Sequence, residues 1–336
     1  MKLLLREDDY TKKMEEMVGP YLSGRRESGY FERVEGQPIY YEHYVPDEVK
    51  GVVVVVHGFS EFIDKFYEVI YYFLKCNYSV WAIEQRGHGR SYRTVANPDM
   101  VQIDDYNELV DDLHYMVEKF VMNDETDGLP KILFGHSMGG AVAACFLERF
   151  PDYFDKAVLS SPMLKLKSGK LPYAVAYVYM KRMIKDGRGK EALLGSKPLG
   201  DTYVFEDGCA TSRQRDEYVY NIKRNEERFR MCMPSCDTVM QFHLLSAYAR
   251  NKRNASRIKA EVLLLQAEND TLVHPEGGRI FIKNVPHGRL IRMRGTKHEI
   301  YNSTDDVLRL YWNLVLDFCG GSLNKIPAPD GLLMIW

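Results

Sequence analysis

The chain lacks long hydrophobic runs and has little net charge. Apolar stretches such as Val52 to Val56 are far shorter than the ~18–20 residues that a membrane span needs. The opening segment, MKLLLREDD, holds three leucines before its charges, which is too short for a signal-peptide core. The formal net charge is −2, whereas a dedicated nucleic-acid binder should be clearly basic. The sequence therefore predicts a cytoplasmic protein that does not bind nucleic acid.

Cysteine is also scarce, with 6 residues scattered along 336. Cys232 and Cys236, with Cys209 and His243 nearby, suggest a metal site, but their spacing fits no common structural zinc pattern. Free thiols behave as small hydrophobic groups, and disulfides are rare in the cytosol. We therefore expect buried or half-buried thiols and no metal.

Apolar residues make up 45% of the chain and charged residues 27%, which are ordinary values for a globular protein. The charge is unevenly distributed. Residues 162–257 hold 19 Lys and Arg against 10 Asp and Glu, so that the remainder of the chain is acidic. The length alone allows about two domains, and this asymmetry marks one segment as distinct.

Strand and helix patterns alternate on both sides of this basic segment. Residues 52–56 form a β-branched run typical of a strand buried on both faces. An antiparallel hairpin is expected over 30–44, around Gly36. The pattern stops at Pro162 and resumes at Glu261, with no clear strand between. We predict a mostly parallel α/β sheet flanked by helices. Its discontinuous core would span 1–161 and 258–320, with a helical cap insertion at 162–257 and a tail at 321–336.

A G-x-S-x-G motif lies between a predicted strand, 131–134, and a predicted helix, 138–149. A nucleophilic serine in this context needs a tight, strained turn, so its neighbours Gly135 and Gly139 must be small. The hydroxyl of Ser137 would then project from the sheet beside the positive end of the following helix. This pattern predicts that Ser137 is a catalytic nucleophile.

Two later strand ends offer the base and the acid that such a serine needs. Asp270 follows the predicted strand 261–266, and His298 follows 289–293, at the sheet edge where Ser137 lies. We predict Asp270 as the acid, with Glu268 as the alternative, and His298 as the base. Three other histidines, none of which closes a strand, fit this role less well: His243, His274 and His287.

The oxyanion hole should combine two backbone N–H groups. One belongs to Met138, directly after the serine, and the other to Phe59, in the loop after strand 52–56. Gly58 lets this loop approach the serine closely. His57 and His136 are expected to brace the site by hydrogen bonding and not to act as bases.

With these residues identified, the chain resembles the α/β-hydrolase superfamily, and within it the branch of monoacylglycerol lipases and bacterial lysophospholipases. The branch usually has an aspartate where this chain has Glu84. The resemblance covers roughly residues 30–320 and is carried by HGFSE at 57–61, EQRGHGRS at 84–91, GHSMGG at 135–140, LLLQAENDTLV at 263–273 and GTKHEI at 295–300, with ATSRQRDEY at 210–218 in the insertion.

This resemblance implies a carboxylic ester hydrolase that acts on monoacyl lipids, either monoacylglycerols or lysophospholipids. Ser137, His298 and Asp270 would carry out acyl transfer through an acyl-serine, without cofactor or metal. An esterase, thioesterase or aminopeptidase on the same scaffold is the alternative. A non-catalytic ligand-binding member is a third hypothesis, against which the complete triad argues.

The insertion would form a cap that filters substrates. Tyr177 and Met180 could line an acyl-chain channel or simply pack the cap onto the core. Arg213 and Arg215 could meet a phosphate headgroup through bidentate hydrogen bonds, or belong to an ordinary solvated helix. The basic excess could also attract the anionic surface of a membrane.

Overall fold

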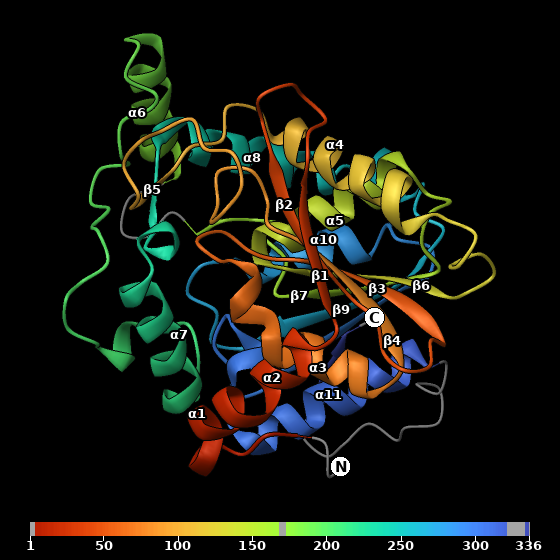
Figure 1. The fold of residues 1–336 in the computed structure, drawn as a ribbon. Helices are drawn as coiled ribbons and strands as arrows, with labels where there is room; N and C mark the ends of the chain where they lie inside the picture. The colour runs from red at the N-terminus through yellow and green to blue at the C-terminus, as the bar shows by residue number, and fades with distance from the viewer. Residues whose placement is uncertain (1–3, 168–172, 321–332, 336) are drawn as a thin grey trace.

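A nine-stranded sheet forms the centre of the molecule, with helices on both of its faces (Figure 1). The computed structural model describes residues 4–167, 173–320 and 333–335. The sheet has the order β1-β2-β4-β3-β6-β7-β9-β10-β11. Its strands are β1 (Arg26–Phe31), β2 (Ile39–Tyr44), β3 (Gly51–Val56), β4 (Tyr78–Ile83), β6 (Lys131–His136), β7 (Lys156–Ser160), β9 (Glu261–Ala267), β10 (Gly288–Met293) and β11 (Leu333–Ile335).

The six strands from β4 to β10 run parallel, and antiparallel strands close the sheet at each edge. Every residue of β3 is buried, as its run of valines predicts for a strand covered on both faces. The hairpin around Gly36 is confirmed, although β1 begins at Arg26 and ends at Phe31, earlier than expected. The predicted α/β class is therefore confirmed.

Two apolar layers separate the sheet from its helices. One layer joins α4 and α5 to the β3 side chains that face them, and the other joins α3 and α11 to the opposite side of β3. Alternate valines of β3 enter alternate layers because successive side chains of a strand point to opposite faces. The helices are α1 (Tyr10–Lys13), α2 (Gly19–Ser23), α3 (Tyr67–Lys75), α4 (Tyr106–Met116), α5 (Ser137–Arg149), α6 (Tyr173–Lys185), α7 (Arg213–Asn225), α8 (Cys236–Ala249), α9 (Lys252–Ala255), α10 (Pro275–Ile282) and α11 (Asp305–Cys319).

The segment 162–257, which we call the cap segment, contains α6, α7, α8 and α9 and lies between β7 and β9 in the chain. It also contains a short strand, β8 (Met233–Pro234), which pairs with β5 (Met100–Val101) from the loop after β4. The amide of Ile103 donates to the hydroxyl of Thr238 at the start of α8. These contacts join the cap segment to the core at a point that its helical pattern did not indicate.

The amino-terminal residues that the structure describes form several short helices. A π-helical turn over Met14–Val18 separates α1 from α2, and α1 packs against α7 of the cap segment (Figure 1). In the part of the chain that the structure describes, no helix is long and apolar enough to cross a membrane. Most of the tail predicted at 321–336 lies outside the described residues, apart from β11.

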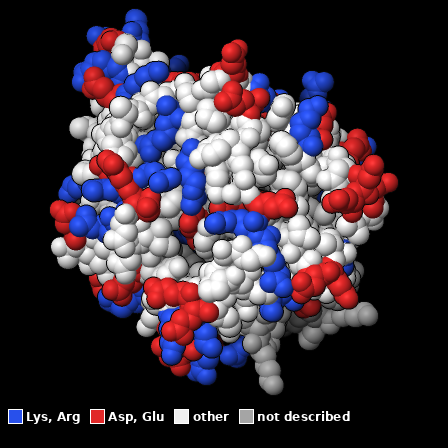
Figure 2. Space-filling model, viewed as in Figure 1, with Lys and Arg blue, Asp and Glu red and all other residues white. Residues whose placement is uncertain are grey.

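Acidic and basic side chains are interleaved on the face shown in Figure 2. Several cations of the cap segment pair with acids of the same segment, such as Arg182 with Asp186 at 2.7 Å and Arg188 with Glu191 at 2.7 Å. The basic excess of the cap segment therefore does not form a face of one sign in this view.

Candidate active site

Ser137 lies where β6 ends and α5 begins, on a backbone turn that few residues adopt. Its φ is 50°, in the left-handed region that is strained for a side chain other than glycine. Gly139 makes this turn possible, because a Cβ at that position would lie 2.2 Å from the carbonyl oxygen of Val56. The strained strand–turn–helix geometry predicted from G-x-S-x-G is confirmed.

The structure brings Ser137, His298 and Asp270 together at the carboxyl edge of the parallel strands. The Oγ of Ser137 lies 2.8 Å from Nε2 of His298, and Nδ1 of the same ring lies 2.7 Å from Oδ2 of Asp270. All three side chains are largely buried. They follow β6, β10 and β9, respectively, whose carboxyl ends share one edge of the sheet.

Asp270 is held in place by its own loop. Its Oδ1 accepts hydrogen bonds from the amides of Leu272 and Val273, both at 2.8 Å. Burial alone would raise the pKa of Asp270, but the hydrogen bonds from His298 and these amides outweigh it and hold the pKa below its usual range. Glu268, the alternative acid, instead accepts from the amide of Gly295 at 3.0 Å. The carboxylate that contacts the imidazole is therefore that of Asp270.

The loop after β3 approaches Ser137 closely. A Cβ added to Gly58, the residue before Phe59, would lie 3.0 Å from Cβ of Ser137. Met138 is the second residue of α5, and the first N–H groups of a helix have no acceptor within it. The amides of Phe59 and Met138, each directly after one of these two residues, remain the predicted donors of the oxyanion hole.

His57 braces this loop, as predicted. Its Nε2 accepts from the amide of Gln85 at 2.9 Å, so the proton lies on Nδ1, which donates to the carbonyl oxygen of Gly58 at 2.7 Å. Burial lowers the pKa of His57 to about 4, and that of His136 also to about 4. Both rings are therefore neutral at pH 7. His136 contacts the carbonyl oxygen of Ser160 through Nδ1 at 3.0 Å.

A buried ion cluster, formed by Glu61, Lys65 and Glu299, links the loop after β3 to the loop that carries His298. Lys65 Nζ lies 2.8 Å from Glu61 and 2.6 Å from Glu299. The same Glu61 accepts from the amide of Gly58 at 2.5 Å. Burial raises the pKa of Glu61, but Lys65 outweighs it and keeps the carboxyl ionised. The motifs HGFSE and GTKHEI contain both acids, but their pairing through Lys65 was not predicted.

Arg215 does not face the triad. Its side chain is fully buried, and its five N–H donors reach protein acceptors. Nε and Nη2 contact Glu68 at 3.1 and 3.2 Å, and Nη2 also donates to the carbonyl oxygen of Leu5 at 2.9 Å. Nη1 reaches Asp305 and the carbonyl oxygen of Ser303, both at 3.3 Å. The expectation that Arg215 meets a headgroup is therefore corrected: it joins the cap segment to α3 and the amino-terminal residues.

The other residues suggested for substrate binding lie within the cap segment. Arg213 is exposed, with Nη2 3.6 Å from Glu206 and its guanidinium 4.8 Å from the ring centroid of Phe205. Tyr177 and Met180 lie on α6, which packs against α8. Met180 is buried and Tyr177 half-buried. None of these contacts reaches Ser137, so the structure leaves their substrate role as a prediction.

The cysteines considered as metal ligands make separate contacts. Cys232 lies 3.3 Å from the carbonyl oxygen of Lys197, whereas Cys236 is buried at the start of α8. Within the described ranges, no three His, Cys, Asp or Glu side chains are grouped to hold a metal ion.

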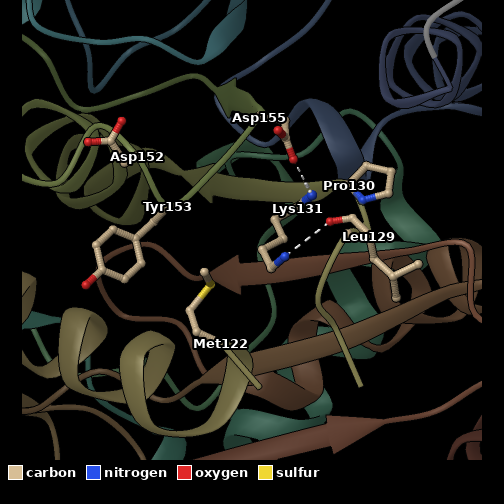
Figure 3. Close-up of a pocket in the computed structure, with 8 residues that line it drawn as sticks. Met122, Leu129, Pro130, Lys131, Asp152, Tyr153 and Asp155 are labelled. Atoms are coloured by element: carbon tan, nitrogen blue, oxygen red, sulfur yellow. Dashed lines mark hydrogen bonds between the residues drawn. The ribbon is translucent and has the colours of Figure 1, made fainter. Parts of the chain in front are cut away.

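A surface hollow of about 380 Å³ lies at the end of the sheet opposite the triad, where β6 begins (Figure 3). It adjoins Lys131, at the start of β6, whereas Ser137 follows the other end of this strand. Six residues of strand span roughly 20 Å, so the hollow is remote from the triad. Lys131 donates to the carbonyl oxygens of Leu129 at 3.2 Å and Thr126 at 2.8 Å, so two of its hydrogen bonds are made within its own loop.

A hydroxyl, an imidazole and a carboxylate in this sequence can support nucleophilic acyl transfer. The imidazole accepts the proton of the attacking hydroxyl, and the carboxylate fixes its orientation and stabilises the imidazolium. The two predicted backbone donors would stabilise the oxyanion that forms.

Comparisons with known proteins agree with this architecture. The family model described as serine aminopeptidase, S33 matches residues 47–305. The chain is 27% identical over 292 residues to a monoacylglycerol lipase of Mycolicibacterium smegmatis, covering 86% of this chain and 96% of that one. It is 25% identical to a probable lysophospholipase L2 of Haemophilus influenzae, covering 88% and 90%.

The fold is also similar to that of a solved structure. A soluble variant of monoglyceride lipase from Saccharomyces cerevisiae, in complex with a substrate analog, superposes with a TM-score of 0.70 at 20% identity. The match covers 89% of this chain and 96% of the yeast chain.

Proposed function

Because this chain belongs to the serine aminopeptidase S33 family of α/β-hydrolases, we propose that it is a serine hydrolase that cleaves carboxylic esters of monoacyl lipids. The observation that carries the proposal is the continuous hydrogen-bonded chain from Ser137 through His298 to Asp270. The names of the two similar lipid hydrolases support the substrate class.

The reaction follows from the positions of these groups. His298 Nε2 takes the proton as Ser137 Oγ attacks the ester carbonyl, and the amides of Phe59 and Met138 stabilise the oxyanion. The imidazolium then gives its proton to the leaving alcohol, so that the C–O ester bond breaks and an acyl-serine remains. Water, deprotonated by His298, attacks this second ester and releases the fatty acid and the free serine.

The test uses purified protein with a monoacylglycerol and a lysophospholipid of the same acyl chain. We expect the release of fatty acid from at least one of them and its loss in Ser137→Ala. An organophosphonate should add its mass to Ser137 of the wild type only. Turnover that persists in Ser137→Ala would refute the assignment of Ser137 as the nucleophile. A wild type that neither turns over nor is labelled would favour the non-catalytic hypothesis.

An aminopeptidase activity is the alternative that the family description raises. Such an enzyme needs a carboxylate that can bind the substrate ammonium. The two acids of the ion cluster, Glu61 and Glu299, both pair with Lys65 instead. Aminoacyl anilides should therefore be poor substrates, and their faster cleavage would reverse the assignment.

Contact with an anionic membrane surface is the second part of this proposal. On α6, Val175 and Val178 are 54% and 66% exposed, and Lys181 and Arg182 are exposed beside them. Apolar groups next to cations suit the boundary between lipid headgroups and acyl chains. α6 stands out from the sheet at the upper left of Figure 1, where a bilayer could reach it.

A further inference from the structure

We propose that Lys223 of the cap segment binds a phosphate carried by the alcohol of the substrate, so that this enzyme prefers monoacyl lipids with a phosphorylated headgroup. The inference rests on the proposed ester hydrolysis and specifies its substrate. It also assigns the headgroup contact to a residue other than Arg213 and Arg215.

Lys223 is placed at the loop that approaches the nucleophile. Its Nζ donates to the carbonyl oxygen of Ser60 at 2.8 Å and to the hydroxyl of Ser60 at 2.9 Å. Ser60 follows Phe59, and Gly58 lies against Ser137. The ammonium group of Lys223 is thus held at Ser60, two residues after Gly58, where this loop comes closest to the nucleophile. Ser60 itself has a φ of 64°, which shows how tightly the loop turns.

The charge of Lys223 has no acidic counterpart in direct contact. In the part of the chain described, no carboxylate lies within 4.0 Å of Nζ, and its two acceptors are neutral. The nearby acids Glu61 and Glu299 are engaged by Lys65. An ammonium group that leaves water without a counter-ion is costly, because neutral acceptors replace only part of its hydration. A phosphate in direct contact with Nζ would replace the hydration that the neutral acceptors do not.

The pKa of Lys223 is consistent with the absence of a carboxylate in direct contact. Burial, and then the positive charge of Lys65, lower the pKa of Lys223 to about 8, against the opposing effects of Cys232, Glu299 and Glu61. The group is still mostly protonated at pH 7. A phosphate within hydrogen-bond distance would stabilise the protonated form further.

The headgroup, and not the acyl chain, is the part of the substrate that suits this place. Two negative and two positive charges lie beside the loop, those of Glu61, Glu299, Lys65 and Lys223. An alkyl chain would desolvate these ions without compensating them, whereas a phosphate can accept the remaining N–H of Lys223. Without Lys223, the two acids would outnumber Lys65 and repel a phosphate.

The decisive experiment compares 1-oleoylglycerol with 1-oleoylglycerol 3-phosphate in micelles of a neutral detergent. We expect Lys223→Met to lower the ratio of kcat/KM, phosphate ester over neutral ester, about 10-fold to 100-fold, which is the range for a lost charge-assisted hydrogen bond. Lys223→Arg, which keeps the charge, should restore most of the ratio. Arg224→Met is the matched control, because Arg224 is the next residue of α7 but pairs with Asp201 at 2.6 Å.

Two results would overturn the inference. If Lys223→Met lowered kcat/KM equally for both substrates, Lys223 would only hold the loop of Ser60. If Arg224→Met changed the ratio as much as Lys223→Met, the general charge of the cap segment would be responsible. Binding of the phosphate lipid to Ser137→Ala, with and without Lys223→Met, keeps the inference testable even if the wild type cleaves neither ester. A 10-fold weaker affinity supports it, and equal affinity refutes it.

Discussion

The carboxyl ends of the parallel strands, which we call the core edge, differ from the cap segment in how their charges are paired. At the core edge, Asp270 contacts His298, and Lys65 lies between two acids. In the cap segment, the guanidinium of Arg215 donates its hydrogen bonds to acceptors outside that segment. Lys223, two turns along the same helix, has only neutral acceptors. At the core edge the ions contact partners of opposite sign, whereas Lys223 of the cap segment has two neutral acceptors in direct contact.

This difference separates two functions. Paired charges at the core edge fix the orientation of the reacting groups before the substrate binds, which is how preorganised sites lower a barrier. A cation without a counter-ion contributes little to orientation but distinguishes a charged ligand from a neutral one. We therefore expect the reaction to depend on the core and the choice of headgroup on α7 of the cap segment.

The largest effect is expected at the core edge, from Asp270→Asn. The amide cannot stabilise the imidazolium or enforce the productive tautomer of His298, so kcat should fall about 10,000-fold, as in comparable triads. Steady-state kinetics on the preferred ester measures this. Glu268→Gln is the control and should remain near wild type. The opposite order of the two variants would make Glu268 the acid.

The contact between the cap segment and the core is tested by Arg215→Met. The change leaves Glu68 buried without its partner, so the free energy of unfolding should fall by ~3–5 kcal/mol. Urea denaturation measures the loss. Arg213→Met, on the exposed side of the same helix, should change stability by about 0.5 kcal/mol or less. A loss below about 1 kcal/mol for Arg215→Met would show that this ion pair does not anchor the cap segment.

The charge of Lys223 can be removed by pH as well as by substitution. Its pKa is lowered to about 8, so its ammonium is present below this pH and lost as pH rises through it. The preference for the phosphate ester over the neutral ester should therefore decline about 10-fold between pH 7 and pH 9. Profiles of kcat/KM for both esters measure it. In Lys223→Arg the decline should disappear, and a decline that persists there would assign it to another group.

The smallest effect is expected at α6. Each basic residue near an anionic bilayer contributes about 1 kcal/mol, so Lys181→Gln should weaken binding to phosphatidylserine vesicles about five-fold. Sedimentation with the vesicles measures the affinity. Lys259→Gln removes one exposed cation outside the cap segment and provides the control. Equal losses in the two variants would show that α6 has no special part in membrane contact.

Most of the catalytic edge could be predicted from the sequence because its signals are local. The strained turn at Ser137 needs small neighbours within two residues, and Asp270 and His298 each follow a recognisable strand. Parallel strands bring their carboxyl ends to one edge, so three loops far apart in the chain had to meet. The geometry of Ser137, His298 and Asp270 shows that they do.

The cap segment was less predictable because its contacts depend on packing between distant elements. In the sequence, Arg213 and Arg215 are equivalent cations of one helix. In the structure, Arg215 is buried against Glu68, 147 residues away in the chain, and Arg213 faces solvent. Helix periodicity gives the side of α7 on which a residue lies, but not which element covers that side.

The sequence by itself determined the α/β class and the candidate residues for acyl transfer, because strand periodicity and the turn chemistry around Ser137 act over a few residues. Only the tertiary structure decided which cations are already neutralised. The reason is that a charge is paired through space: Lys65 meets Glu299 across 234 residues, whereas Lys223 reaches only the neutral oxygens of Ser60 across 163.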